Sequence, residues 1–169
     1  MEAEHVTICQ VNPDYVVGFV PGLAVAFWRQ HTRPEYVQQL EAVARQAYKA
    51  SKQPIGLVQI APVTAIAPDA RARTALVRML RALDGTVGCS ALVHETEGFR
   101  AALIRSIVTG LAALSSPGYP HRVFTTVGEA AAWMGNHQKA LIPARVRRVV
   151  AEVREAASPT KSAGSAQRR

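Results

Sequence analysis

The chain contains 169 residues, of which 49% are hydrophobic and 19% are charged, while aromatic residues make up only 6%. This composition excludes an intrinsically disordered chain, and two cysteines are too few for a disulfide framework. We predict that Cys9 and Cys89, which both lie in apolar strand-like runs, are buried free thiols. The N-terminus lacks the residue order of a signal peptide and no apolar run approaches the length of a membrane span, so we expect a cytoplasmic protein without a transmembrane segment.

The positive charge is concentrated towards the C-terminal end. The formal net charge is +8 at pH 7. Residues 1–137 contain 12 Lys and Arg against 10 Asp and Glu, whereas residues 138–169 contain 8 against 2. A nearly neutral body argues against a fold that grips nucleic acid over its whole surface. The basic extension indicates an appended electrostatic segment.

The first part of the chain predicts three strands followed by a helix. Residues 5–11, 15–20 and 23–29 are rich in apolar and β-branched residues and are separated by Asn-Pro-Asp and Pro-Gly turns, which predicts a β-meander. Thr32 and Glu35 have the spacing of a capping box, so we expect the helix to begin with Thr32 as its cap. Its apolar positions recur at helical spacing and comprise Val37, Leu40, Val43, Ala44, Ala47 and Tyr48.

Strands and helices alternate in the rest of the chain. We predict strands over residues 55–60, 86–93 and 122–125, helices over about 69–83 and 98–114, and a further helix that opens with a second capping box at Thr126 and Glu129. Such alternation requires crossover helices between strands of one sheet. The predicted fold is therefore an α/β domain with a mixed β-sheet over residues 1–137, followed by a basic amphipathic helix over 138–157 and a disordered basic tail over 158–169.

The order of these elements, together with the phrase RVFTTVGEAAAWM from Arg122 to Met134, resembles the STAS family. That family is named after sulfate transporters and anti-sigma-factor antagonists, and the chain is most similar to its stand-alone bacterial members. The resemblance spans about residues 5–135 and implies a STAS-like fold with a regulatory role in protein–protein interaction. Antagonists of the family carry a phosphorylatable hydroxyl at the start of the helix after the central strand. Here Ala70 or Arg71 stands at that place, so we do not expect the phosphorylation switch.

The loop after the strand at 55–60 is the predicted binding surface. Ligands of α/β domains gather at the carboxyl ends of strands, but this loop has no glycine-rich phosphate cradle, cysteine, histidine or lysine. We therefore predict a non-enzymatic domain of a bacterial cytoplasmic signalling system that binds another protein here. The predicted partner-binding residues are Val63, Thr64, Ile66, Asp69, Arg71 and Arg73. The alternative is a small-molecule or lipid-binding cavity beneath the loop at 62–73.

Other candidate chemistry is sparse in the sequence. The segment His94-Glu95-Thr96-Glu97 lacks the second histidine or the cysteines of metal-binding motifs, so we interpret it as a polar loop between a strand and a helix. The remaining histidines have no partner at metal-ligand spacing and are interpreted as surface or half-buried residues; they are His5, His31, His121 and His137. Trp28 and Trp133 are interpreted as core residues. We predict no catalytic residue, metal site or cofactor.

The C-terminal segment carries an apolar stripe and a set of arginines. Pro143 suits a first helical turn, and the stripe comprises Ile142, Val146, Val149 and Val153. Either this stripe docks on the body and completes its core, or it is offered to a partner or to a second copy of the chain as a homo-oligomer contact. The electrostatic residues of the segment are Arg145, Arg147, Arg148 and Arg154. The basic tail adds a third hypothesis, weak association with nucleic acid or an acidic membrane.

Overall fold

The computed structural model describes residues 4–96, 98, 102, 106, 109, 110, 113 and 116–158. Its strands are β1 (Thr7–Val11), β2 (Tyr15–Val20), β3 (Leu23–Trp28), β4 (Ile55–Ala61), β5 (Val87–His94) and β6 (His121–Phe124). Its helices are α1 (Pro34–Ser51), α2 (Ala70–Ala82), α4 (Val127–His137) and α5 (Pro143–Ala156). Most of the helix predicted over 98–114 lies outside the described residues.

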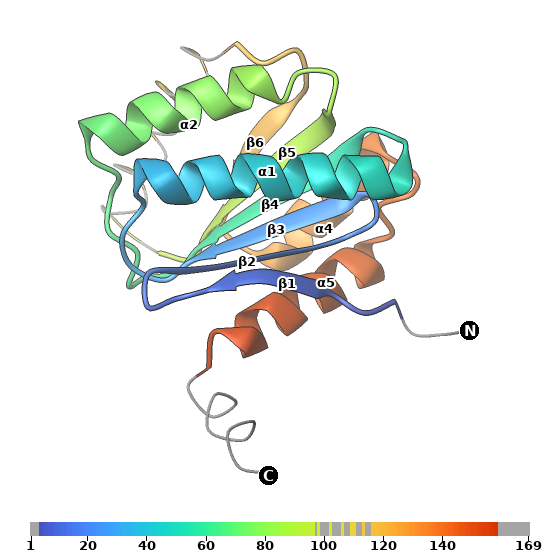
Figure 1. The fold of residues 1–169 in the computed structure, drawn as a ribbon, viewed down its shortest axis with the longest axis horizontal. Helices are drawn as coiled ribbons and strands as arrows, with labels where there is room; N and C mark the ends of the chain where they lie inside the picture. The colour runs from blue at the N-terminus through green and yellow to red at the C-terminus, as the bar shows by residue number, and fades with distance from the viewer. Residues whose placement is uncertain are drawn as a thin grey trace, which may run out of the picture.

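The six strands form one mixed sheet in which neighbours in sequence are also neighbours in space, in the order β1-β2-β3-β4-β5-β6 (Figure 1). β1, β2 and β3 pair antiparallel, whereas β3, β4, β5 and β6 pair parallel. Turns join the antiparallel strands, and helices provide the crossovers that parallel strands need. The predicted α/β fold with an N-terminal meander and a mixed sheet is confirmed.

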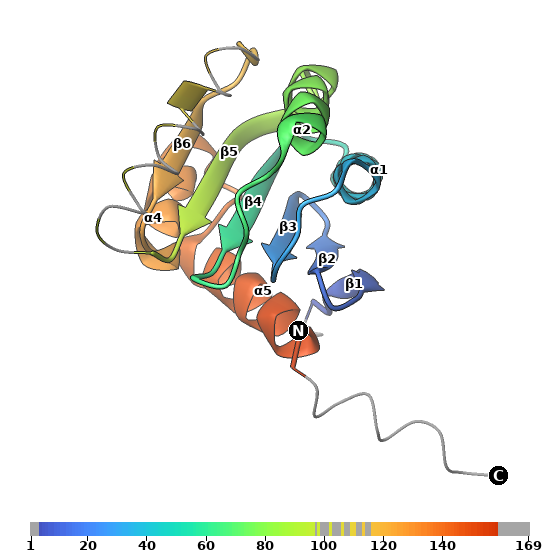
Figure 2. The same cartoon turned by 90° about the vertical axis from the view of Figure 1, so that its left-hand side faces the viewer.

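Helices cover both faces of the sheet. α1 and α2 lie on one face, and α4 and α5 lie on the other (Figure 2). The two faces have separate hydrophobic cores because successive side chains of a strand point in opposite directions. On β4, Leu57 packs with the α1 and α2 side while Val58 packs with the α4 and α5 side. Residues of one strand that are two positions apart therefore share a face, which matters for the site described below.

The two predicted capping boxes have different outcomes. Thr126 caps α4 as expected, since its hydroxyl accepts a hydrogen bond from the backbone N–H of Glu129 at 3.2 Å. Thr32 does not cap α1, and the prediction there is wrong: the cap position falls on Arg33, which provides no side-chain cap. Pro34 opens the helix and holds the residue before it in an extended conformation, with φ −115° and ψ 152° at Arg33. The helix consequently starts one residue too late for Thr32 to reach it.

The two cysteines also differ from each other. Both are free thiols, and Cys89 is buried as predicted, but Cys9 is exposed, so the prediction is wrong for that residue. Cys9 lies on β1, all five residues of which are exposed. β1 is an edge strand of the sheet, and although α5 contacts it, its residues stay exposed, unlike those of the central strands. The apolar run here therefore predicts the strand correctly but not the burial of its residues.

Candidate functional site

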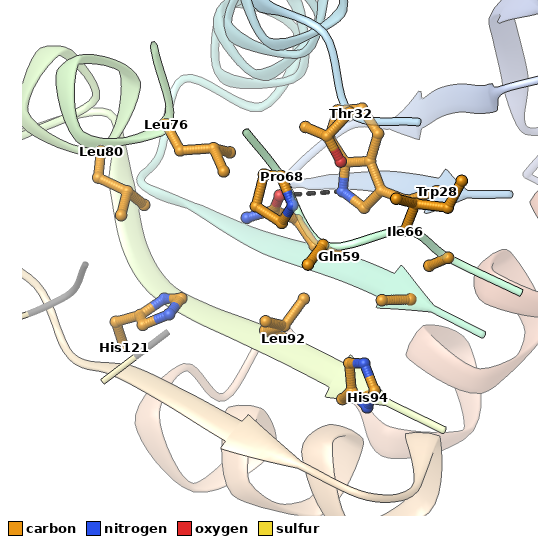
Figure 3. Close-up of a pocket in the computed structure, with 13 residues that line it drawn as sticks. Trp28, Thr32, Gln59, Ile66, Pro68, Leu76, Leu80, Leu92, His94 and His121 are labelled. Carbon is orange, nitrogen blue, oxygen red and sulfur yellow. Dashed lines mark hydrogen bonds between the residues drawn. The ribbon is translucent and has the colours of Figure 1, made fainter. Parts of the chain in front are cut away.

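A pocket of about 90 Å³ lies between the sheet, α2 and the loop at 62–69 that connects β4 to α2 (Figure 3). Its described walls are mainly apolar, and they come from four strands as well as from the loop and α2. The lining residues are Trp28, Thr32, Gln59, Ala61, Ala65, Ile66, Ala67, Pro68, Leu76, Leu80, Leu92, His94 and His121. The volume is somewhat smaller than that of an engineered apolar cavity of about 150 Å³ that binds benzene. The pocket therefore suits a small molecule or one end of a larger one.

The loop at 62–69 is held in place by hydrogen bonds to the end of β3. The Thr64 hydroxyl donates to the backbone oxygen of Arg29 at 2.8 Å, and the N–H of Ile66 donates to the backbone oxygen of Gln30 at 2.9 Å. These bonds turn Ala65 inward, where it is only 9% exposed. At the end of the loop Asp69 caps α2 by accepting a hydrogen bond from the N–H of Ala72 at 2.8 Å. The loop thus forms one wall of the pocket.

An aromatic stack forms the wall near α1. The Trp28 indole N–H donates to Gln59 Oε1 at 3.1 Å, and both side chains are almost fully buried. The Tyr15 ring stacks on Trp28 with 5.4 Å between ring centroids, and the Tyr36 ring also stacks on Tyr15, with 4.6 Å between their centroids. Such a buried stack leaves the indole few alternative orientations. Trp28 therefore belongs to the core, as predicted, and also lines the pocket.

Two histidines supply the imidazoles of the pocket. His94 ends β5 and is only 6% exposed, with its Nε2 3.4 Å from the Thr96 hydroxyl. This position corrects the interpretation of His94 as part of a polar loop, because the strand continues through it. His121 begins β6, and burial lowers the pKa of its imidazole from 6.5 to about 4. His121 is therefore neutral at pH 7 and can offer one N–H and one lone pair.

Ser90 lies beside His121 in the sheet, because the two residues are register partners across β5 and β6. It shares its face of β5 with Leu92 and His94, both of which line the pocket. Ser90 is completely buried. Neither its Oγ nor the Nδ1 of His121 has a hydrogen-bond partner among the residues that the structure describes. Buried polar groups without partners are uncommon in proteins, and a bound ligand or an ordered water can supply the hydrogen bonds that they need.

Few polar side chains line the pocket among the described residues. The lining contains no carboxylate, amine, guanidinium or thiol, and its polar side chains are those of Thr32, Gln59, His94 and His121. Within the described ranges there is also no group of three or more His, Cys, Asp or Glu side chains that could hold a metal ion. What these residues provide is an apolar space with a few hydrogen-bonding atoms, the usual make-up of a small-molecule site.

The predicted partner-binding residues separate into two groups. Ile66 lines the pocket at its rim and is 47% exposed. The others are not among the lining residues, and Thr64 and Asp69 use their side chains for the internal bonds described above. Val63 is 57% exposed, and Arg71 and Arg73 are exposed on the first turn of α2. The exposed apolar and basic side chains therefore form a surface next to the pocket rather than part of it.

The apolar stripe of the C-terminal helix docks on the chain's own body. Val146, Val149 and Val153 are fully buried in the core that α5 shares with α4 and the sheet. Of the two alternatives left open by the sequence, the structure has the docked helix, and these three residues are not available to a partner or a second copy. Ile142 is the exception, at 59% exposed. The helix predicted as a separate segment over 138–157 consequently shares a core with the body.

Most of the arginines proposed for electrostatic contacts are paired within the chain. Arg145 donates to both carboxylate oxygens of Glu4, at 2.8 and 2.6 Å, and this guanidinium lowers the pKa of the Glu4 carboxyl. Arg148 pairs with Glu4 at 3.1 Å and with Glu152 at 2.6 Å. Arg154 pairs with Glu95. Arg147 is exposed. Pairing with the body reduces the charge that α5 offers to nucleic acid or to an acidic surface.

Sequence reasoning missed Ser90, His94, His121 and Thr32 as residues in or beside the pocket. For β5 there was a usable signal, since Ser90 and His94 are polar residues at even spacing within an otherwise apolar strand. There was none for His121, whose neighbour is fixed by the register between β5 and β6.

Comparison with family models, with curated proteins and with solved structures returned no match to this chain. None of the described helices is long and apolar enough to cross a membrane.

Proposed function

We propose that this protein is a non-catalytic binding domain, and that its site is the apolar pocket between β4, β5, α2 and the loop at 62–69. The ligand is a small molecule, or one end of a larger one, with a mainly apolar body. The observation that carries this proposal is the pocket itself: Trp28, Leu80 and Ala65 are buried in its walls, and yet a space of about 90 Å³ is left between them. Protein interiors are otherwise packed with few voids of that size.

The test is a titration with toluene, observed through the indole N–H resonances of the two tryptophans. Trp28 lines the pocket, whereas Trp133 packs against Phe124 on the other side of the sheet and serves as an internal control. Toluene should shift the Trp28 resonance in a saturable way and leave that of Trp133 in place. Ala65→Phe fills the pocket and should abolish the effect. Val63→Phe, which introduces the same side chain at an exposed position of the same loop, should not. Equal responses of both tryptophans would refute the proposal.

A second candidate function is contact with another protein, in the regulatory role that the resemblance to the STAS family implies. The observation that favours it is the exposure of Val63 and Ile66 beside the exposed guanidinium groups of Arg71 and Arg73. Apolar and arginine side chains are enriched in the contact regions of interfaces. If this surface binds a partner, Val63→Asp abolishes capture of that partner while toluene binding is unchanged. Capture that survives Val63→Asp and Ile66→Asp alike would exclude it.

A further inference from the structure

The polar atoms at the β5–β6 side of the pocket indicate which chemical class of ligand fits. Ser90 Oγ and His121 Nδ1 are both buried, and neither has a hydrogen-bond partner among the described residues. The two residues are direct neighbours across β5 and β6, so their side chains lie on the same face of the sheet. His121 lines the pocket, and Ser90 lies next to it on the same face of the sheet without being one of the lining residues. A hydroxyl group that reaches both atoms can hydrogen-bond to both, since a hydroxyl donates and accepts at once.

Two other polar side chains of the pocket, Gln59 and His94, already have polar contacts within the chain. Gln59 Oε1 accepts the indole N–H of Trp28 at 3.1 Å, and His94 Nε2 lies 3.4 Å from the Thr96 hydroxyl. A polar group of a ligand therefore gains most in hydrogen bonding at the β5–β6 side of the pocket. Its apolar body would then extend over Leu92 and Leu80 towards Trp28 and the loop.

The lining also discriminates against charge. None of its described residues is Lys, Arg, Asp or Glu. Burial keeps His121 neutral by lowering the pKa of its imidazole to about 4, so at pH 7 that side chain supplies no positive charge either. A carboxylate or an ammonium group that entered would lose its hydration without gaining an ion-pair partner, which is strongly unfavourable.

Resting on the proposed binding function, we propose that the ligand is an uncharged molecule with an apolar body and one hydroxyl-like group, and that this group hydrogen-bonds to Ser90 Oγ and His121 Nδ1. The competing explanation is that an ordered water alone satisfies these two atoms. In that case a hydroxyl on the ligand adds no binding free energy at this end of the pocket. The two explanations therefore predict different affinities for two probes of the same size, one with a hydroxyl and one without.

The experiment compares phenol, toluene and benzoate at pH 7, each titrated into the full chain while the indole resonance of Trp28 is followed. Phenol and toluene have nearly the same size, and phenol is uncharged at this pH. Toluene is the more apolar of the two, yet phenol should bind at least as tightly because its hydroxyl hydrogen-bonds to Ser90 and His121. Benzoate should bind at least tenfold more weakly than phenol, if its binding saturates at all.

The variants Ser90→Ala and His121→Leu, combined in one chain, remove both polar atoms. This change should not impair folding, because the Ser90 Oγ and His121 Nδ1 atoms that it deletes are buried and have no partner among the described residues. The ratio of the phenol and toluene dissociation constants should then move by roughly tenfold in favour of toluene. Cys89→Ala is the matched control, since Cys89 neighbours Ser90 on β5 but faces the other core, and it should leave the ratio unchanged.

Two results separate this inference from the proposed function. If toluene and phenol both bind but the double variant leaves their ratio unchanged, or if benzoate binds as tightly as phenol, the inference is wrong and the pocket still binds ligands. If none of the three probes shifts Trp28 more than Trp133, the proposed function fails, and the inference fails with it.

Discussion

Because the His121 imidazole is buried and neutral, we predict that the free energy of unfolding depends on pH in a defined way. Burial lowers the pKa of this group from 6.5 to about 4 in the folded chain. Above pH 6.5 this imidazole is unprotonated in both the folded and the unfolded state, so its titration takes nothing from the free energy of unfolding. As the pH falls below 6.5 the unfolded state takes up the proton first, so stability decreases until the pH reaches about 4 and then levels off.

The magnitude follows from the gap between the two pKa values. One pKa unit corresponds to about 1.4 kcal/mol, so the gap between 6.5 and about 4 amounts to roughly 3 kcal/mol of unfolding free energy. That is a large fraction of the roughly 5–15 kcal/mol by which a typical domain is stable. The cause is the cost of placing a charged imidazolium in the buried position, where no described lining residue carries an opposite charge.

The measurement is urea denaturation of the wild type and of His121→Leu at a series of pH values between about 7.5 and 4.5. Carboxyl groups such as Glu4 also lose stabilising interactions in acid, but they do so in both proteins, and the difference between the two curves isolates His121. The wild type should lose about 2.5 kcal/mol more than the variant over this range. Parallel curves, or a His121 imidazole that titrates near pH 6.5 by NMR, would show that the site is hydrated and the reasoning wrong.

Two further predictions concern the helices. Thr126→Ala should lower the free energy of unfolding by about 1 kcal/mol because it removes the hydrogen bond that caps α4. Thr32→Ala should lower it much less, because Thr32 caps no helix. Equal losses of the two variants in urea denaturation would contradict the assigned caps. Val149→Ala should cost roughly 2 kcal/mol through the lost methyl groups and the remaining cavity, while Ile142→Ala at an exposed position should be nearly neutral. A neutral Val149→Ala would mean that α5 does not dock on the body.

Much of the fold could be predicted because it depends on local periodicity. The alternating apolar runs of β2 and β3 and the helical stripe of α1 are properties of short windows, and Pro54 and Gly22 mark where elements end or turn. Short sequence windows are insufficient where a single neighbouring residue, or the position of a strand in the sheet, decides the local structure. Pro34 displaced the cap of α1 from Thr32, and the edge position of β1 left its apolar residues uncovered.

The pocket could be predicted only in outline. The sequence predicts the loop after β4 as the binding region because ligands gather at the carboxyl ends of parallel strands, and a cavity under this loop is one of the alternatives that it leaves open. The polar end was not identified, because Ser90 and His121 are 31 positions apart in the chain and meet only through the register of β5 and β6. A shift of that register by one residue would turn one of the two side chains to the opposite face. No property of either segment alone fixes it.

The loop at 62–69 links the two candidate functions, and its residues allow them to be separated. Ala65 points inward and is buried, Val63 points outward and is exposed, and Ile66 both lines the pocket and is half-exposed. A ligand that fills the space under Ala65 contacts the same backbone that presents Val63. If the two functions are coupled, toluene binding changes the affinity for a partner, and by linkage the partner changes the affinity for toluene by the same factor. If they are independent, Ala65→Phe affects only ligand binding, Val63→Asp affects only the partner, and Ile66→Asp weakens both because that side chain belongs to both surfaces.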